Sequence, residues 1–122
     1  MNLLKKRQSK LNYLELTPVR CYEHEIRETD GLVNVLVPKF KDRILGRFLQ
    51  PRLKYKYFKA EFDEFGTSAW LKMDGKKKVN AIASELTKEF GEKIQPINPR
   101  LSTFCNQLYN EGFITFIEIE RK

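Results

Sequence analysis

The chain has 122 residues, of which 41% are hydrophobic and 32% are charged, as expected for one soluble globular domain with a modest core. No apolar run approaches the ~18 residues that a membrane span needs, and the basic first ten residues do not lead into an apolar export segment. The two cysteines, Cys21 and Cys105, stand apart and lack metal-ligand spacing. We therefore expect a single cytoplasmic domain, residues 1–122, that does not cross a membrane.

The net charge of +7 is concentrated in one part of the chain. Residues 39–59 contain eight basic side chains against Asp42 alone, so this segment nets 8 − 1 = +7 and the remaining residues balance to zero. An acidic partner would be drawn to this region by long-range attraction. The alternative is a solvated face that only aids solubility. The basic residues are Lys39, Lys41, Arg43, Arg47, Arg52, Lys54, Lys56 and Lys59.

The first structured region is predicted to be strands, after an N-terminal extension of residues 1–20. The runs YEHEIRE (22–28) and LVNVLV (32–37) flank Asp30-Gly31, a dipeptide that supplies the positive φ angles of a tight hairpin. Pro38 ends the second run because proline lacks a backbone donor. Residues 21–62 therefore hold a hairpin and a further strand, separated by a basic insertion at 39–52 that forms a short helix or a loop.

The third strand is predicted at LKYKYFKAEF, residues 53–62. Its residues alternate between two faces and are rich in β-favouring aromatics. One face carries Lys54, Lys56, Phe58, Ala60 and Phe62, and the other Tyr55, Tyr57, Lys59 and Glu61.

From Asp63 the apolar period changes from two to 3.6, which predicts three helices within residues 63–112. Asp63 is placed to cap the first helix, which ends at Asp74-Gly75. The second carries its apolar stripe from Val79 to Phe90 and stops at Gly91. Asn98 and Pro99 are expected to open the third as cap and first helical residue, with Gly112 ending it. The tail, residues 113–120, returns to strand periodicity.

This order predicts an α+β, winged-helix-like fold: a three-stranded antiparallel sheet packed on three helices, with a short C-terminal strand. The expected core between the layers is Phe65, Trp70, Ile82, Leu86, Leu101, Phe104 and Leu108.

Nothing in the sequence assembles a catalytic group. His24 lies in a predicted strand between two glutamates, and Asp63 and Glu64 are adjacent positions that point in different directions. Nucleotide-binding and metalloprotease motifs are missing from the sequence. We expect a protein that is not an enzyme and that holds no cofactor and no metal.

Two kinds of binding remain, to nucleic acid or to peptide, with a scaffold role as a third possibility. Three helices and a basic pI suit a winged helix-turn-helix regulator that binds DNA. However, seven residues, GEKIQPI, separate the second and third helices, where a helix-turn-helix uses about 3–4. The third helix also carries a single basic residue, Arg100, where a recognition helix usually carries more.

Peptide binding fits the third strand better. A strand at a sheet edge offers unpaired backbone groups, to which an extended peptide can add as a further strand. Main-chain pairing would supply affinity, and the lysines would favour an acidic peptide. The alternative is an ordinary edge strand that its lysines protect from aggregation.

Two stretches carry a family resemblance: FDEFGTSAWLKMDGKKKVNAIASELTKEFG, residues 62–91, and FCNQLYNEGFI, residues 104–114. Their spacing of Asp-Glu, Gly, Trp, Asp-Gly and two apolar helices resembles the PqqD family of pyrroloquinoline quinone biosynthesis, from about Glu61 to Ile114. Lys78 departs from the Thr or Ser that often precedes the second helix in this family, and the insertion at 39–52 is longer than usual.

The resemblance implies a peptide chaperone with the fold called a RiPP recognition element. Such a domain holds the leader part of a ribosomal precursor peptide against its third strand and third helix. It presents this peptide to a radical SAM enzyme or another peptide-modifying enzyme. Carried onto this sequence, the resemblance implies a peptide-binding site made of Lys54, Tyr55, Lys56, Tyr57, Phe58, Lys59, Arg100, Thr103 and Gln107.

Overall fold

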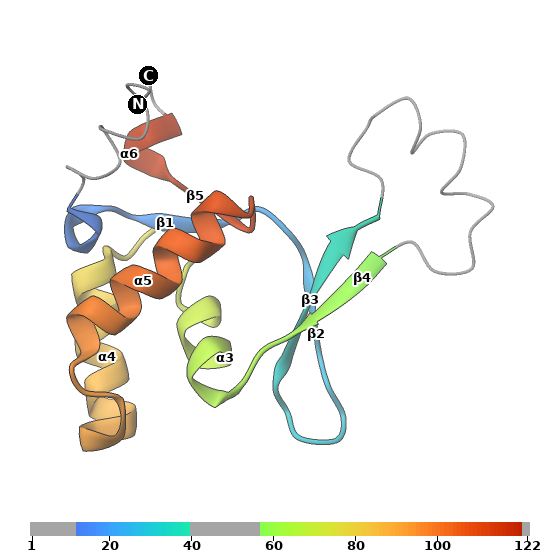
Figure 1. The fold of residues 1–122 in the computed structure, drawn as a ribbon, viewed down its shortest axis with the longest axis horizontal. Coiled ribbons are helices and arrows are strands. Elements are labelled where there is room, and N and C mark those ends of the chain that lie inside the picture. Colours follow the sequence, from blue (N-terminus) through green and yellow to red (C-terminus); the bar gives the residue numbers. More distant parts are fainter. Residues whose placement is uncertain (1–11, 40–56, 121–122) are drawn as a thin grey trace. The chain divides into compact units, whose positions relative to one another are not determined.

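The computed structural model describes residues 12–39 and 57–120 (Figure 1). It confirms an α+β fold with a three-stranded antiparallel sheet, three longer helices and a short strand near the C-terminus. The chain divides into two compact units. We call residues 22–68 the sheet unit, and residues 12–21 together with 69–120 the helical unit. The expectation that residues 1–122 form one domain remains a prediction.

The sheet unit is built on the predicted hairpin. Strands β2 (His24–Ile26), β3 (Val33–Pro38) and β4 (Tyr57–Glu61) lie in the order β2-β3-β4, and both pairs are antiparallel. Gly31, with φ of 76°, makes the turn, and its N–H donates to the Arg27 carbonyl at 2.9 Å. The Asp-Gly signal thus predicted the hairpin correctly.

Two strand boundaries differ from the sequence-based expectation. β2 is shorter than residues 22–28, and β3 includes Pro38 instead of ending before it. Pro38 lies opposite Tyr57, at the end of the β3–β4 pairing. Pairs of this kind alternate between hydrogen-bonded and non-hydrogen-bonded, and a non-hydrogen-bonded position needs no donor.

Helix α3 (Glu64–Leu71) follows β4 directly. The Asp63 carboxylate accepts a hydrogen bond from the Gly66 N–H at 2.8 Å, which confirms Asp63 as the cap. The Thr67 hydroxyl accepts from the buried Val33 N–H at 2.9 Å. This bond fixes the first turns of α3 to β3.

Helix α4 (Val79–Phe90) confirms the stripe predicted from its 3.6-residue period. Val79, Ile82 and Leu86 are fully buried, and Gly91 ends the helix with φ of 66°. A short 3-10 turn, η3 (Gly91–Ile94), follows.

The third long helix, α5 (Ile97–Asn110), begins earlier than expected. Asn98 is already helical and Pro99 occupies the third helical position, so the prediction that Asn98 caps this helix is wrong. The Gln95 side-chain oxygen accepts from the Ile97 N–H at 3.2 Å. The first N–H groups of a helix have no partner within it, so a proline in the first turn loses nothing.

The helical unit has a continuous apolar core. Phe104, which was expected there, is only partly buried, and so is Phe65 in the sheet unit. Whether helices cover the sheet, as the sequence suggested, stays a prediction because the two layers belong to different units. The core residues of the helical unit with at most 3% exposure include Ala69, Trp70, Met73, Val79, Ile82, Leu86, Ile94, Leu101, Cys105, Leu108, Ile114 and Phe116.

Part of the expected N-terminal extension is an ordered element of the helical unit. A 3-10 turn, η1 (Tyr13–Glu15), leads into β1 (Pro18–Arg20), which pairs antiparallel with β5 (Ile114–Phe116). At Gly75, with φ of 79°, an added Cβ would lie 3.3 Å from Val19. The Asp-Gly turn is therefore also a point of close packing against β1.

The tail does not remain extended as its alternating residues suggested. After β5 it turns into α6 (Ile117–Glu120). The Glu118 carboxylate accepts from the Thr17 N–H at 2.8 Å and from the Thr17 hydroxyl at 2.7 Å, and the Ile117 N–H donates to the Thr17 carbonyl. These tertiary bonds override the local strand pattern.

Candidate functional site

Among the described residues, strand β4 forms an edge of the sheet. It pairs with β3 on one side, and within residues 12–39 and 57–120 no strand pairs with its other side. Figure 1 shows β4 together with the β2–β3 hairpin in the sheet unit. The expectation that the third strand lies at an edge is met by the described part of the chain.

The hydrogen bonds of the sheet show which backbone groups of β4 face outward. The Phe62 N–H donates to the Val33 carbonyl at 2.9 Å, so Phe62 points its backbone groups at β3. Antiparallel pairs alternate, which directs Phe58 and Ala60 toward β3 as well. The N–H and C=O groups of Tyr57, Lys59 and Glu61 therefore point outward, three donors and three acceptors at the spacing of a further strand.

Aromatic and cationic side chains accompany this edge. Phe58 is 62% exposed and Tyr57 is 39% exposed, and they lie on opposite faces because they are neighbours in a strand. The Lys39 ammonium lies 5.3 Å from the centroid of the Phe58 ring, within the range of a cation–π contact. A guest strand would thus meet an aromatic side chain on either face.

On the Lys59 face the sheet is polar. The Lys59 ammonium lies 3.0 Å from the Glu25 carboxylate, which also accepts from the Asn34 amide at 3.0 Å. The hydrogen bond from Asn34, and then that from Lys59, lowers the pKa of Glu25. Lys59 therefore already forms an ion pair within the sheet. The sequence alone did not reveal this contact.

Arg27 holds the hairpin turn to the end of β4. Its guanidinium donates to Asp30 at 3.0 Å, to the Asn34 side chain at 2.9 Å and to the Phe62 carbonyl at 3.0 Å. The hydrogen bond from Arg27 is the largest cause that lowers the pKa of Asp30. The signal that could have revealed this role is the position of Arg27 three residues before the aspartate of the Asp-Gly turn.

Within the sheet unit, the described residues differ in net charge from residues 40–56 between them. Its described residues, 22–39 and 57–68, hold three basic and seven acidic side chains, so 3 − 7 = −4. Residues 40–56 contribute six basic side chains and Asp42, so 6 − 1 = +5. The positive charge expected to steer a ligand thus lies mainly outside the described residues, as do Lys54, Tyr55 and Lys56 of the predicted site.

The remaining predicted residues lie on α5. Arg100, Thr103 and Gln107 are all exposed, on the side of the helix away from the buried Leu101 and Cys105. The Arg100 guanidinium donates to the Lys93 carbonyl at 3.4 Å. Because α5 and β4 belong to different units, a groove shared by the two stays a prediction.

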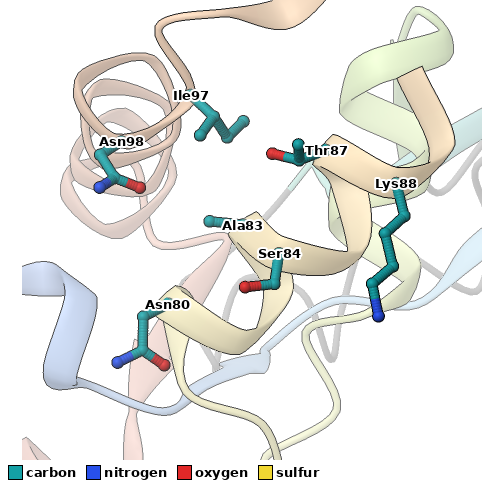
Figure 2. Close-up of a pocket in the computed structure, with 7 residues that line it drawn as sticks. All are labelled: Asn80, Ala83, Ser84, Thr87, Lys88, Ile97 and Asn98. Atoms are coloured by element: carbon teal, nitrogen blue, oxygen red, sulfur yellow. The ribbon is translucent and has the colours of Figure 1, made fainter. Parts of the chain in front are cut away.

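A hollow of about 440 Å³ lies in the helical unit, between α4 and the start of α5. Figure 2 shows small polar side chains, one lysine and two apolar side chains around it. None of the predicted site residues lines this hollow. The lining residues are Asn80, Ala83, Ser84, Thr87, Lys88, Ile97 and Asn98.

The chemistry of the described residues offers little to catalysis. No group of three or more His, Cys, Asp or Glu side chains in residues 12–39 and 57–120 is arranged to hold a metal ion. Burial raises the pKa of the Cys105 thiol to about 12, so the thiolate needed of a nucleophile does not form near neutral pH.

None of the described helices has the length and apolar composition to span a bilayer.

The comparison with protein-family models agrees with the resemblance drawn from the sequence. Residues 56–114 match the family model described as Coenzyme PQQ synthesis protein D (PqqD). This segment, from β4 through α5 into β5, is therefore PqqD-like, and the predicted family resemblance is confirmed. The comparison with curated proteins and the comparison with solved structures each gave no significant match.

Proposed function

We propose that this protein is a non-catalytic peptide-binding protein that captures an extended peptide as an added strand on β4. The observation that carries the proposal is the outward edge of β4, where Tyr57, Lys59 and Glu61 offer alternating backbone donors and acceptors. A peptide paired there gains main-chain hydrogen bonds whatever its sequence. Its alternate side chains then meet Phe58 on one face and Lys59 on the other.

The family match supports the biological setting of this proposal. Residues 56–114 match a family of coenzyme PQQ synthesis, and β4 begins that segment. We infer that the guest is the leader part of a ribosomal precursor peptide, presented to a modifying enzyme such as a radical SAM protein. Arg100, Thr103 and Gln107 of α5 complete the proposed binding surface.

We further propose that the peptide is acidic. The described sheet unit nets −4 and does not itself favour an acidic guest. The preference therefore rests on residues 40–56, which net +5 and join directly to both β3 and β4. Charge of this kind accelerates encounter more than it strengthens the final complex.

The proposal is tested by removing one outward donor without changing the pairing with β3. Lys59→Pro eliminates an outward N–H, and proline is tolerated on the free side of an edge strand. Lys59→Ala is the matched control, because it also removes the side chain but keeps the N–H. The probe is a fluorescently labelled peptide of alternating valine and glutamate, titrated by fluorescence anisotropy.

We expect Lys59→Pro to weaken binding of this peptide at least tenfold relative to Lys59→Ala. The proline removes the backbone hydrogen bond that residue 59 donates to the peptide, and the adjacent backbone hydrogen bonds are weakened with it. Equal affinities for the two variants would contradict strand addition. A parallel titration with duplex DNA separates the DNA-binding alternative, which requires affinity that falls steeply with added salt.

A further inference from the structure

The outward edge of β4 is complementary to itself in one antiparallel register. Two copies of an edge strand can pair about a twofold axis, and every position then faces a fixed partner position. When Ala60 meets Ala60 of a second copy, Lys59 of each copy lies directly opposite Glu61 of the other. We propose that the protein forms a homodimer through β4 in this register, which joins the two three-stranded sheets into one sheet of six strands.

The backbone directions agree with this register. Tyr57, Lys59 and Glu61 point their N–H and C=O groups outward, so Lys59 and Glu61 of the two copies form hydrogen-bonded pairs on either side of the axis. Ala60 points its backbone groups toward its own β3. It therefore meets its counterpart in a non-hydrogen-bonded pair, where the side chains lie closest.

The charges select this register over the adjacent one. Shifting the axis by one position places Lys59 opposite Lys59, a like-charge pair that destabilises a sheet. The Ala60-centred register instead makes two opposite-charge pairs on one face. The Lys59 ammonium has three donors, so its 3.0 Å pairing with Glu25 leaves it able to bind a second carboxylate.

Phe58 gains a partner in the same register. It lies opposite Phe62 of the second copy, on the face away from Lys59, and aromatic cross-strand pairs are among the stabilising ones. This pairing covers a side chain that is 62% exposed in the single chain. The contact is small beside the ~1,600 Å² of a standard interface, so the dimer is weak and dissociates on dilution.

This inference does not depend on the proposed capture of a peptide, because it needs only the described residues of β4 and a second copy of them. The two nevertheless compete, since one edge accepts one strand. Self-pairing would thus keep the edge covered at high protein concentration and release it to a guest strand.

Charge reversal tests the register directly. Lys59→Glu places two carboxylates opposite each other in both cross-strand pairs, and Glu61→Lys places two ammonium groups there, so each variant alone faces two repulsive pairs. In an equimolar mixture of the two variants, the mixed dimer has an opposite-charge pair at each position where the dimer of a single variant has a like-charge pair. Sedimentation velocity of the full chain at low ionic strength, up to about 1 mM protein, measures the association, and circular dichroism verifies that each variant is folded.

The mixed dimer contains one copy of each variant. In it, the new glutamate of one copy faces the new lysine of the other, and the unchanged Glu61 of the first copy faces the unchanged Lys59 of the second. Both pairs are therefore of opposite charge, as in the unchanged protein.

We expect each reversal to weaken dimerisation about tenfold or more, and the mixture to recover the association of the unchanged protein. Failure of the unchanged protein to associate at the highest concentration would overturn the inference. So would reversals that dimerise normally, or a mixture that does not recover.

A disulfide at the axis gives a second, register-specific measurement. In a Cys21→Ser background, Ala60→Cys brings two Cα atoms to about 4.5 Å, within the range of a disulfide. We expect Ala60→Cys to form covalent dimers on mild oxidation and Lys59→Cys to form few. The reverse result would show the Lys59-centred register and overturn the one proposed.

Discussion

At the scale of single residues, polar side chains fix the ends of each unit. Arg27 joins the hairpin turn, through Asp30, to the carbonyl of Phe62, the residue that follows β4. Thr17 and Glu118 join segments that lie 101 residues apart in sequence. The Arg27–Asp30 pair is local, but the bond from Arg27 to the Phe62 carbonyl and the Thr17–Glu118 contact do not follow from a local pattern. Partners so distant along the chain depend on the completed fold.

The Thr17–Glu118 contact makes a prediction about pH. Burial raises the pKa of Glu118, but the hydrogen bonds from Thr17 outweigh it and the net pKa is lowered. A carboxylate with a lowered pKa stabilises the fold above its unfolded value, about 4.3, and this stabilisation is lost as the pH falls through the folded pKa. We expect Glu118→Gln to lower the Tm at pH 7, and the difference from the unchanged protein to shrink as the pH falls below the unfolded value of about 4.3.

Thermal unfolding followed by circular dichroism from pH 7 to pH 3 measures this difference. Glu111→Gln is the control, because Glu111 is an exposed carboxylate at the end of α5. A deficit of Glu118→Gln that persists or grows at low pH would argue against the carboxylate as the stabilising group.

At the scale of elements, the sequence predicted what depends on local period and failed where distant contacts decide. The stripe from Val79 to Phe90 has three full turns of 3.6 periodicity, and α4 has those bounds. In contrast, β1 has three residues and exists because it pairs with β5. The residues of α6 alternate like a strand, yet bonds to Thr17 make them helical.

Helix α4 begins without a favourable cap, as the sequence suggested. Lys78 has the extended backbone of an N-cap residue. Among the described residues, its side chain makes no capping hydrogen bond. Its ammonium group instead lies 3.6 Å from the Glu15 carboxylate. Exposed pairs of this kind contribute ~0–1 kcal/mol, whereas a serine cap contributes about 1 kcal/mol. We expect Lys78→Ser to raise the free energy of unfolding by up to about 1 kcal/mol.

Urea denaturation measures this change, with Lys76→Ser as the matched control because exposed Lys76 lies in the same loop but precedes the cap. The control is expected to change stability by less than about 0.5 kcal/mol. Similar effects of the two substitutions would show that the serine gains nothing as a cap.

At the scale of the whole molecule, charge and structure are unevenly distributed. The described residues sum to −4, since the helical unit balances and the sheet unit does not. The stretches 1–11, 40–56 and 121–122 contribute +4, +5 and +2, which restores the total of +7. Residues 40–56 are basic, but the pooled charge of the sequence concealed the net negative charge of the described residues of the sheet unit.

The peptide-binding site, too, could be predicted from the sequence only in part. Alternation along residues 53–62 predicted which side chains of β4 share a face, because that period is fixed by strand geometry. It could not predict that Lys59 pairs with Glu25, or which residues point their backbone groups outward, since both depend on the register with β3 and β2.

Residue-resolved amide hydrogen exchange in dilute protein tests the free edge most directly. We expect the amides of Phe58, Ala60 and Phe62 to be protected by their bonds to β3, and those of Tyr57, Lys59 and Glu61 to exchange rapidly. Adding the valine–glutamate peptide should then slow the second set selectively. Protection of Tyr57, Lys59 and Glu61 in the dilute, unliganded protein would show that the edge is already occupied, and would contradict strand addition on β4.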